Sequence, residues 1–151
     1  MGLNTESQDL IFIDVSGFSM WPFLKPGKKL VVKKVSVGDL KIGDIILYRA
    51  NSQLVCHRLL KKSTDKNKNL LYTRGDNSGG LLQLVTEEMF LGKVIGALRN
   101  GKMINLAGQK QQFINRLIVE IAPLVTRFKP YYVIFRKILL GSKRIKKLGC
   151  R

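Results

Sequence analysis

The sequence has 151 residues, a length typical of one domain, with 45% hydrophobic and 25% charged residues as in ordinary soluble proteins. Lys and Arg number 27 against 10 Asp and Glu, which gives a net charge of +17. One histidine and two well-separated cysteines, Cys56 and Cys150, exclude a histidine-rich zinc site and a disulfide framework, and we expect no cofactor. No signal peptide and no bilayer-spanning apolar stretch is visible, which predicts a cytosolic protein.

Seven short apolar segments predict strands in the first two thirds of the chain, because they are rich in Val, Ile, Leu and Tyr and are separated by turn-forming residues. They are residues 10–15, 29–35, 44–49, 53–60, 69–74, 91–98 and 102–106. "RANSQ" favours a hairpin turn after the third strand, and "KSTDKNKN" a polar loop after the fourth. The spacing predicts a mainly β domain over residues 1–107, built as a compact antiparallel sheet or small barrel.

From Gln109 the apolar residues recur at three- and four-residue steps, which predicts C-terminal amphipathic helices within residues 108–151. Pro123 ends or kinks the first helix, and Pro130 begins a second one. For residues 113–128 the pattern fits either packing on the sheet or lying at a membrane surface. Residues 131–151 carry seven basic residues and no acid, which favours an anionic membrane surface or an acidic partner.

The stretch "GFSMWPFLKPGKK" places Ser19 between bulky apolar residues, in an order that neither helix nor strand periodicity requires. A serine in a turn is the plain interpretation, and a core histidine is the plain interpretation of His57. However, His57 and Asp76 lie at or just beyond predicted strands, where a rigid sheet can direct side chains to one point. A neutral imidazole can take the proton of a serine hydroxyl, and a carboxylate can orient that imidazole. Ser19, His57 and Asp76 are therefore candidate catalytic residues.

Several motifs in chain order carry a resemblance to a known family. They are "SGFSMWP", "VGDLKIGDIILYR", "VCHRLL", "YTRGDNS" and "MFLGKVIG", which together span roughly residues 11–98. The first resembles the Ser-x-Met-x-Pro nucleophile box of signal peptidase I and of the LexA-type self-cleaving repressors. "VCHRLL" resembles the box of the endoplasmic-reticulum and archaeal signal peptidases in which histidine replaces the lysine base. "YTRGDNS" resembles the box with the conserved acid, and the other two resemble the Gly-Asp-Ile-Val and Gly-Lys-Val strands.

The resemblance implies a fold of the signal peptidase/LexA-like type and a serine endopeptidase that cleaves a leader or signal segment from a precursor protein or peptide. It implies that Ser19 is the nucleophile, that His57 is the general base, and that Asp76 orients His57. Backbone N–H groups near Ser19 would form the oxyanion hole. We expect Gly17 to permit a close turn there and Met20 to anchor it.

The sequence departs from the family pattern after Asp76, because "NSGGLLQLV" lacks the second acid of the eukaryotic enzymes. Lys61 and Lys62 offer a lysine base of the bacterial kind, but their polar, cationic surroundings are typical of a solvated loop edge. A self-cleaving repressor is not favoured, since only eighteen residues precede Ser19. A basic β-barrel that binds nucleic acid is the alternative from another class, but most strand aromatics fall at apolar positions. A non-catalytic member is disfavoured by the intact candidate residues.

Overall fold

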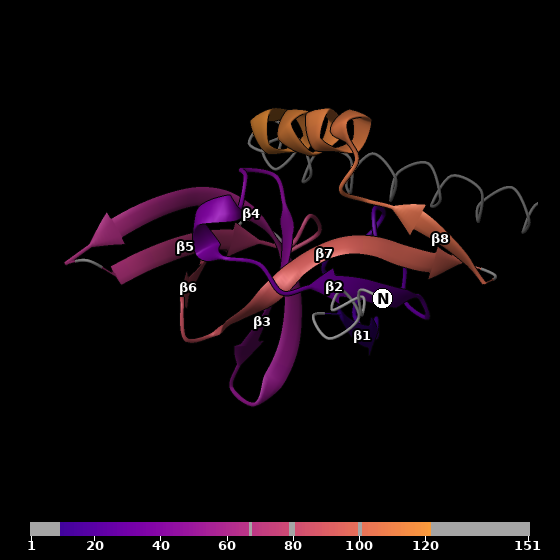
Figure 1. Cartoon of the computed structure of the whole chain (residues 1–151), viewed down its shortest axis with the longest axis horizontal. Coiled ribbons are helices and arrows are strands. Elements are labelled where there is room, and N and C mark those ends of the chain that lie inside the picture. The colour runs from indigo at the N-terminus through magenta and orange to yellow at the C-terminus, as the bar shows by residue number, and fades with distance from the viewer. Residues whose placement is uncertain (1–9, 67, 79–80, 100, 122–151) are drawn as a thin grey trace, which may run out of the picture. The chain divides into compact units, whose positions relative to one another are not determined.

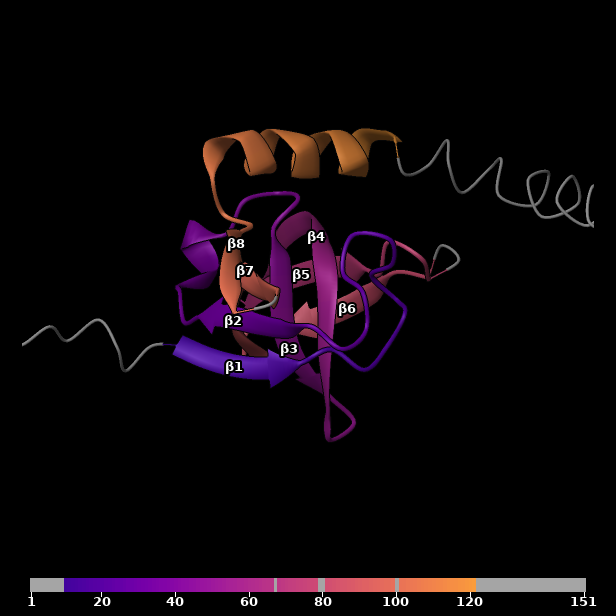
Figure 2. The same cartoon turned by 90° about the vertical axis from the view of Figure 1, so that its right-hand side faces the viewer.

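The computed structural model describes residues 10–66, 68–78, 81–99 and 101–121, which form one curled antiparallel sheet followed by a helix (Figure 1; Figure 2). The strands are β1 (Leu10–Asp14), β2 (Lys29–Lys33), β3 (Ile45–Ala50), β4 (Gln53–Asp65), β5 (Lys68–Arg74), β6 (Gln83–Thr86), β7 (Phe90–Arg99) and β8 (Lys102–Asn105). Their order is β1-β2-β7-β3-β4-β5-β6, and β8 pairs with β7. The predicted mainly β fold is confirmed.

Strand β3 divides the core into two clusters. Its residues Ile45, Ile46, Leu47 and Tyr48 are all buried, although successive side chains of a strand point to opposite faces. Ile45 and Leu47 pack in one cluster, and Ile46 and Tyr48 pack in the other. In the ladder between β3 and β4, His57 lies opposite Ile46. His57 therefore emerges on the same face as Tyr48.

The predicted hairpin turn is confirmed, since Asn51 and Ser52 both have positive φ values, 47° and 62°, between β3 and β4. The loop predicted from "KSTDKNKN" is wrong, because β4 continues to Asp65 and β5 already starts at Lys68. The two strands extend together as an antiparallel ribbon whose backbone groups satisfy each other, so polar side chains do not prevent strand formation there. Strand β6 was not predicted. It supplies a residue of the site described below.

Residues 109–121 form a helix in which the one buried side chain is polar and Ile118 and Val119 are partly buried. Asn115 is buried, and its backbone lies 3.0 Å from where a Cβ on Gly43 would be. Gly43 has a φ of 95°, which favours glycine. The apolar side chains of Phe113, Ile114 and Leu117 are 66%, 45% and 41% exposed. These three side chains are therefore exposed, and the two interpretations of residues 113–128 stay predictions.

The second predicted helix and residues 131–151 lie outside the described residues, as does Cys150. Within the described ranges, no helix combines the length and the apolar character needed to cross a bilayer.

Candidate active site

Ser19 lies in the turn between β1 and β2, and the side chains that follow it anchor this turn. Met20 and Leu24 are each 2% exposed and belong to one core cluster. The Leu24 N–H donates to the Met20 carbonyl over 2.8 Å, and the Trp21 N–H donates to the Phe18 carbonyl over 3.1 Å. The anchoring role expected of Met20 fits this packing. Ser19 itself is half-buried and lines the open pocket described below.

His57 lies in β4 and is buried, and its ring is held by a polar side chain of the neighbouring strand. Its Nδ1 is 3.0 Å from the hydroxyl of Tyr48. The Tyr48 hydroxyl in turn donates to Oε1 of Gln83, which comes from β6. The Ser19 hydroxyl makes no hydrogen bond to the ring among the described residues. Such contacts are often long before substrate binds.

The loop that follows β5 contacts both Ser19 and His57. The Asn77 N–H donates to the Ser19 carbonyl over 2.7 Å, and the Asn77 side-chain amide donates to the Phe18 carbonyl over 3.3 Å. A Cβ on Gly75 would lie 2.7 Å from the Ser19 carbonyl oxygen and 3.0 Å from His57 Nε2, and it would overlap Ser78 Oγ. The Ser19 carbonyl oxygen and Nε2 of His57 thus both lie beside the Cα of Gly75, and only a glycine leaves room for them.

Gly17 was expected to permit a close turn, but nothing lies within 4 Å of a Cβ built on it. The steric requirement for glycine therefore falls on Gly75, in a different loop. The close approach is made between the 75–78 loop and the Ser19 turn, and not within that turn.

Asp76 is bound by Arg58, the residue that follows the candidate base. Nε and a terminal nitrogen of Arg58 donate to the two carboxylate oxygens over 2.8 and 2.7 Å. The guanidinium also donates to the Gly43 carbonyl over 2.9 Å and lies 4.8 Å from the ring centroid of Phe23. Arg58 is 1% exposed, so this bidentate pair is shielded from water. It fixes the loop that carries Gly75 and Asn77.

The environment keeps the imidazole neutral at physiological pH. Burial lowers the pKa of His57 below its ordinary value of 6.5, while the Gln83 side chain and the Asp76 charge oppose this shift. A neutral imidazole is the form that accepts a proton. Burial also raises the pKa of the neighbouring Cys56 thiol to about 12. Cys56 is therefore no thiolate nucleophile at neutral pH.

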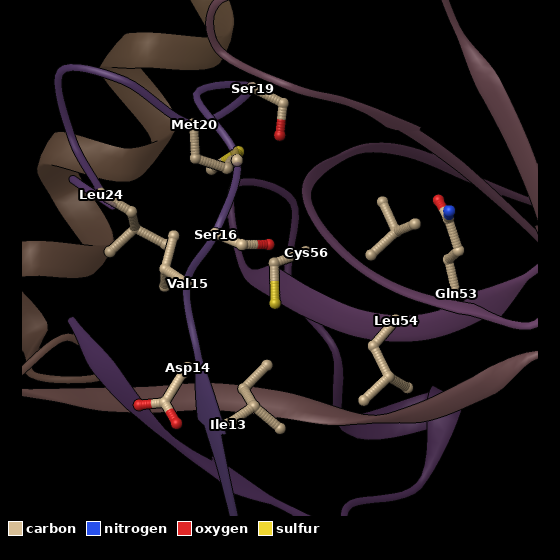
Figure 3. Close-up of a pocket in the computed structure, with 12 residues that line it drawn as sticks. Ile13, Asp14, Val15, Ser16, Ser19, Met20, Leu24, Gln53, Leu54 and Cys56 are labelled. Atoms are coloured by element: carbon tan, nitrogen blue, oxygen red, sulfur yellow. The ribbon is translucent and has the colours of Figure 1, made fainter. Parts of the chain in front are cut away.

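An open pocket of about 540 Å³ lies between the 13–20 segment and the start of β4, with Ser19 at one end (Figure 3). Ile13, Leu54 and Cys56 contribute apolar surface, and Asp14 is the acidic residue of the lining. On the described residues, β1 is paired only with β2, and the part of β4 before Arg58 is paired only with β3. Two strand edges therefore face this pocket without a partner strand.

The lysines considered as alternative bases are engaged by other partners. The Lys62 ammonium donates over 3.0 to 3.1 Å to the backbone carbonyls of Val37, Gly38 and Leu40. The Lys61 ammonium lies 5.6 Å from the ring centroid of Tyr72. These contacts account for both lysines without a catalytic role.

The sequence reasoning missed Tyr48 and Gln83. A two-residue turn at Asn51 and Ser52 sets the register of β3 and β4, and this register puts Tyr48 and His57 on one face. Tyr48 was therefore detectable from the hairpin. Gln83 had no comparable signal, because β6 has four residues and meets the site only through its pairing with β5.

No family model matches the chain. The chain is 34% identical over 83 residues to the signal peptidase complex catalytic subunit SEC11 of Zygosaccharomyces rouxii, and this match covers 53% of the chain and 48% of that protein. The resemblance to signal peptidases of the endoplasmic-reticulum type is confirmed. This signal-peptidase-like chain spans about half the length of the relative that it matches.

Proposed function

We propose that the chain is a serine endopeptidase that cleaves a leader or signal segment from a precursor protein or peptide. The observation that carries this proposal is the 75–78 loop, which holds the backbone of Ser19 beside Nε2 of His57. The similarity to a signal peptidase catalytic subunit supports the same substrate class. No bound cofactor or metal enters the mechanism.

In the proposed reaction, Ser19 Oγ attacks the scissile carbonyl while its proton passes to His57 Nε2. The imidazolium then gives this proton to the leaving amine, and a water molecule activated in the same way hydrolyses the acyl-enzyme. Asp76 stabilises the imidazolium through its charge, at a position fixed by Arg58. Backbone N–H groups of the Ser19 turn donate to the oxyanion.

We further propose that the substrate binds as an extended peptide in the pocket beside Ser19. The free edges of β1 and β4 offer backbone donors and acceptors on both sides of the pocket. A peptide strand placed there satisfies these groups, as in other cases of strand addition. The apolar lining from Ile13, Leu54 and Cys56 favours small or apolar substrate side chains next to the scissile bond.

The experiment is cleavage of a pool of precursor-derived peptides, analysed by mass spectrometry. Ser19→Ala and His57→Ala should each lower kcat by about 10⁴-fold or more, and the two losses should not add in the double variant. Ser16→Ala is the matched control, because this second serine also lines the pocket. Unchanged cleavage by Ser19→Ala, or a loss in Ser16→Ala equal to that in Ser19→Ala, would exclude Ser19 as the nucleophile.

We also propose peripheral association of residues 131–151 with an anionic membrane surface. The supporting observations are the seven basic residues of this tail and the exposed apolar side chains of Phe113 and Leu117 on the preceding helix. Vesicles with anionic lipid should bind the full chain, and less strongly as salt rises. Deleting residues 131–151 should reduce this binding while leaving peptide cleavage intact. Binding to neutral vesicles or to RNA that is as strong as binding to anionic vesicles would argue against the proposal.

A further inference from the structure

The side chain that touches Nδ1 of His57 is a tyrosine and not a carboxylate. Tyr48 is 1% exposed and lies between His57 and Gln83. Both oxygens of Asp76 accept hydrogen bonds from Arg58, and among the described residues Asp76 acts on the ring through its charge and not through a hydrogen bond. The hydrogen bond that can orient the imidazole is therefore the one to Tyr48, whose hydroxyl direction is fixed in turn by Gln83.

The direction of this hydrogen-bond chain follows from its far end. Gln83 presents Oε1 to Tyr48, and a carbonyl oxygen can only accept. The Tyr48 proton is thus committed to Gln83, and the phenolic oxygen is left to accept from the ring. Burial raises the pKa of Tyr48, so the hydroxyl stays protonated and keeps this direction. An acceptor at Nδ1 requires the Nδ1–H tautomer, in which Nε2 carries a free lone pair.

We infer that Tyr48 and Gln83 are positioning residues that hold His57 in the Nδ1–H tautomer with its basic Nε2 directed to Ser19. They perform the orienting part of the role that a buried carboxylate performs in a Ser-His-Asp triad. The catalytic meaning of this inference rests on the proposed function, but the tautomer itself does not. The charged groups near the ring, Asp76 and Arg58, are paired with each other, and Nδ1 of the ring contacts the neutral Tyr48 side chain.

Because the chain contains one histidine, nitrogen-15 NMR reports its tautomer without assignment ambiguity. Spectra of the full chain are recorded above pH 7.5, because burial lowers the pKa of His57 and the neutral ring is the form to be observed. The wild type should show a protonated Nδ1 and an unprotonated Nε2. Gln83→Leu and Tyr48→Phe should each shift the population toward Nε2–H, because the acceptor chain is broken. Gln83→Glu should keep Nδ1–H, since an ionised carboxylate only accepts.

An Nε2–H tautomer in the wild type would overturn the inference, and so would identical populations in Gln83→Leu, Gln83→Glu and the wild type. Gln83 is exposed, so its variants should fold even if Tyr48→Phe does not. Kinetics separate the positioning role of Gln83 from the nucleophilic role of Ser19. Gln83→Leu should lower kcat by about 10²-fold with little change in KM, and Gln83→Glu should retain most of kcat. If Ser19→Ala still cleaves, the proposed function fails while the tautomer result stands. If Ser19 is required and Gln83→Leu keeps full kcat, the positioning role fails alone.

Discussion

Two buried ion pairs join motifs that are distant in the sequence, and they differ in what they hold. Lys93 Nζ lies 2.8 Å from one oxygen of Asp44, which also accepts the Lys41 N–H over 2.8 Å. Lys93 faces β3 in the β3–β7 ladder, so this pair ties β7 to the segment before β3. Arg58 instead binds Asp76 through both oxygens and holds the loop that contacts Ser19. A buried ion pair thus holds two parts of the sheet domain together in one case and holds a loop of the candidate site in the other.

The comparison teaches that burial of a charge pair does not by itself mark a catalytic group. Asp44 is the more deeply buried acid, with 3% exposure of its side chain against 12% for Asp76. Only the Arg58–Asp76 pair has neighbours that reach the nucleophile, because Gly75 and Asn77 flank Asp76 in the chain. The loss of either pair should destabilise the fold, and the loss of one should also disturb the chemistry.

The largest effect is expected for the cationic partners. Arg58→Met and Lys93→Met each leave a carboxylate buried without its partner, which costs about 3–5 kcal/mol of unfolding free energy. Arg58→Met should also lower kcat/KM of the folded protein by about 10²-fold or more, because the 75–78 loop loses its position. Lys93→Met should leave kcat/KM of the folded fraction unchanged. Urea unfolding and peptide cleavage measure the two quantities.

A control variant distinguishes a loss of stability from a loss of activity. The double variant Lys93→Met with Asp44→Leu replaces the whole pair by apolar groups and should recover much of the lost stability. If Lys93→Met lowers kcat/KM of the folded fraction as much as Arg58→Met does, the distinction between the two ion pairs is incorrect.

The glycines that precede the two acids offer a smaller and sharper test. A Cβ on Gly75 would press on Ser19 and His57, so Gly75→Ala should lower kcat by about 10²-fold. Gly43 has a φ of 95° and borders Asn115, so Gly43→Ala should cost about 1–3 kcal/mol of stability and spare kcat. Gly17→Ala should change neither. A kcat for Gly75→Ala equal to that of Gly17→Ala would mean that the loop does not set the site.

The sequence predicted those parts of the fold that depend on local pattern. The paired strands β3 and β4 followed from apolar runs around a turn whose residues adopt positive φ. The β4–β5 ribbon was missed because inter-strand backbone bonds, not an apolar face, sustain it. The helix at 109–121 was predicted, but the contact of Asn115 with Gly43 was not, because no local pattern in the sequence indicates it.

For the candidate site, the motifs indicated Ser19, His57 and Asp76 but not how they are connected. The order of the motifs predicts which residues form the site, but it does not predict which hydrogen bonds each of them makes. The contacts of Tyr48 with His57 and Gln83 join three strands, so they depend on register and sheet order and not on any local pattern. Asp76 was interpreted as the orienting carboxylate, and that role stays a prediction. The structure shows its bond to Arg58.

The smallest effect is expected when the two acids, Asp76 and Asp44, are each replaced by asparagine. The charge of Asp76 raises the pKa of His57 against the stronger lowering by burial. Asp76→Asn removes this charge, so the pKa of His57 should fall further, and the unpaired Arg58 should act in the same direction. The base works when unprotonated, and activity is lost as pH falls through its pKa. The acid limb of kcat/KM should therefore move to lower pH in Asp76→Asn.

At pH 7 the same variant should lose about tenfold in kcat, or about 1.4 kcal/mol, because the imidazolium formed in the reaction loses a favourable charge while the remaining amide oxygen still accepts from Arg58 and holds the 75–78 loop. Asp44→Asn, whose partner is Lys93, should leave both the limb and kcat unchanged. The measurement is the pH dependence of peptide cleavage for the wild type and both variants. A limb that moves to higher pH in Asp76→Asn, or one that moves equally in Asp44→Asn, would contradict a charge effect of Asp76 on His57. A 10⁴-fold loss in Asp76→Asn would instead assign the orienting role to Asp76 itself, since wrong tautomers cost about that much in serine peptidases.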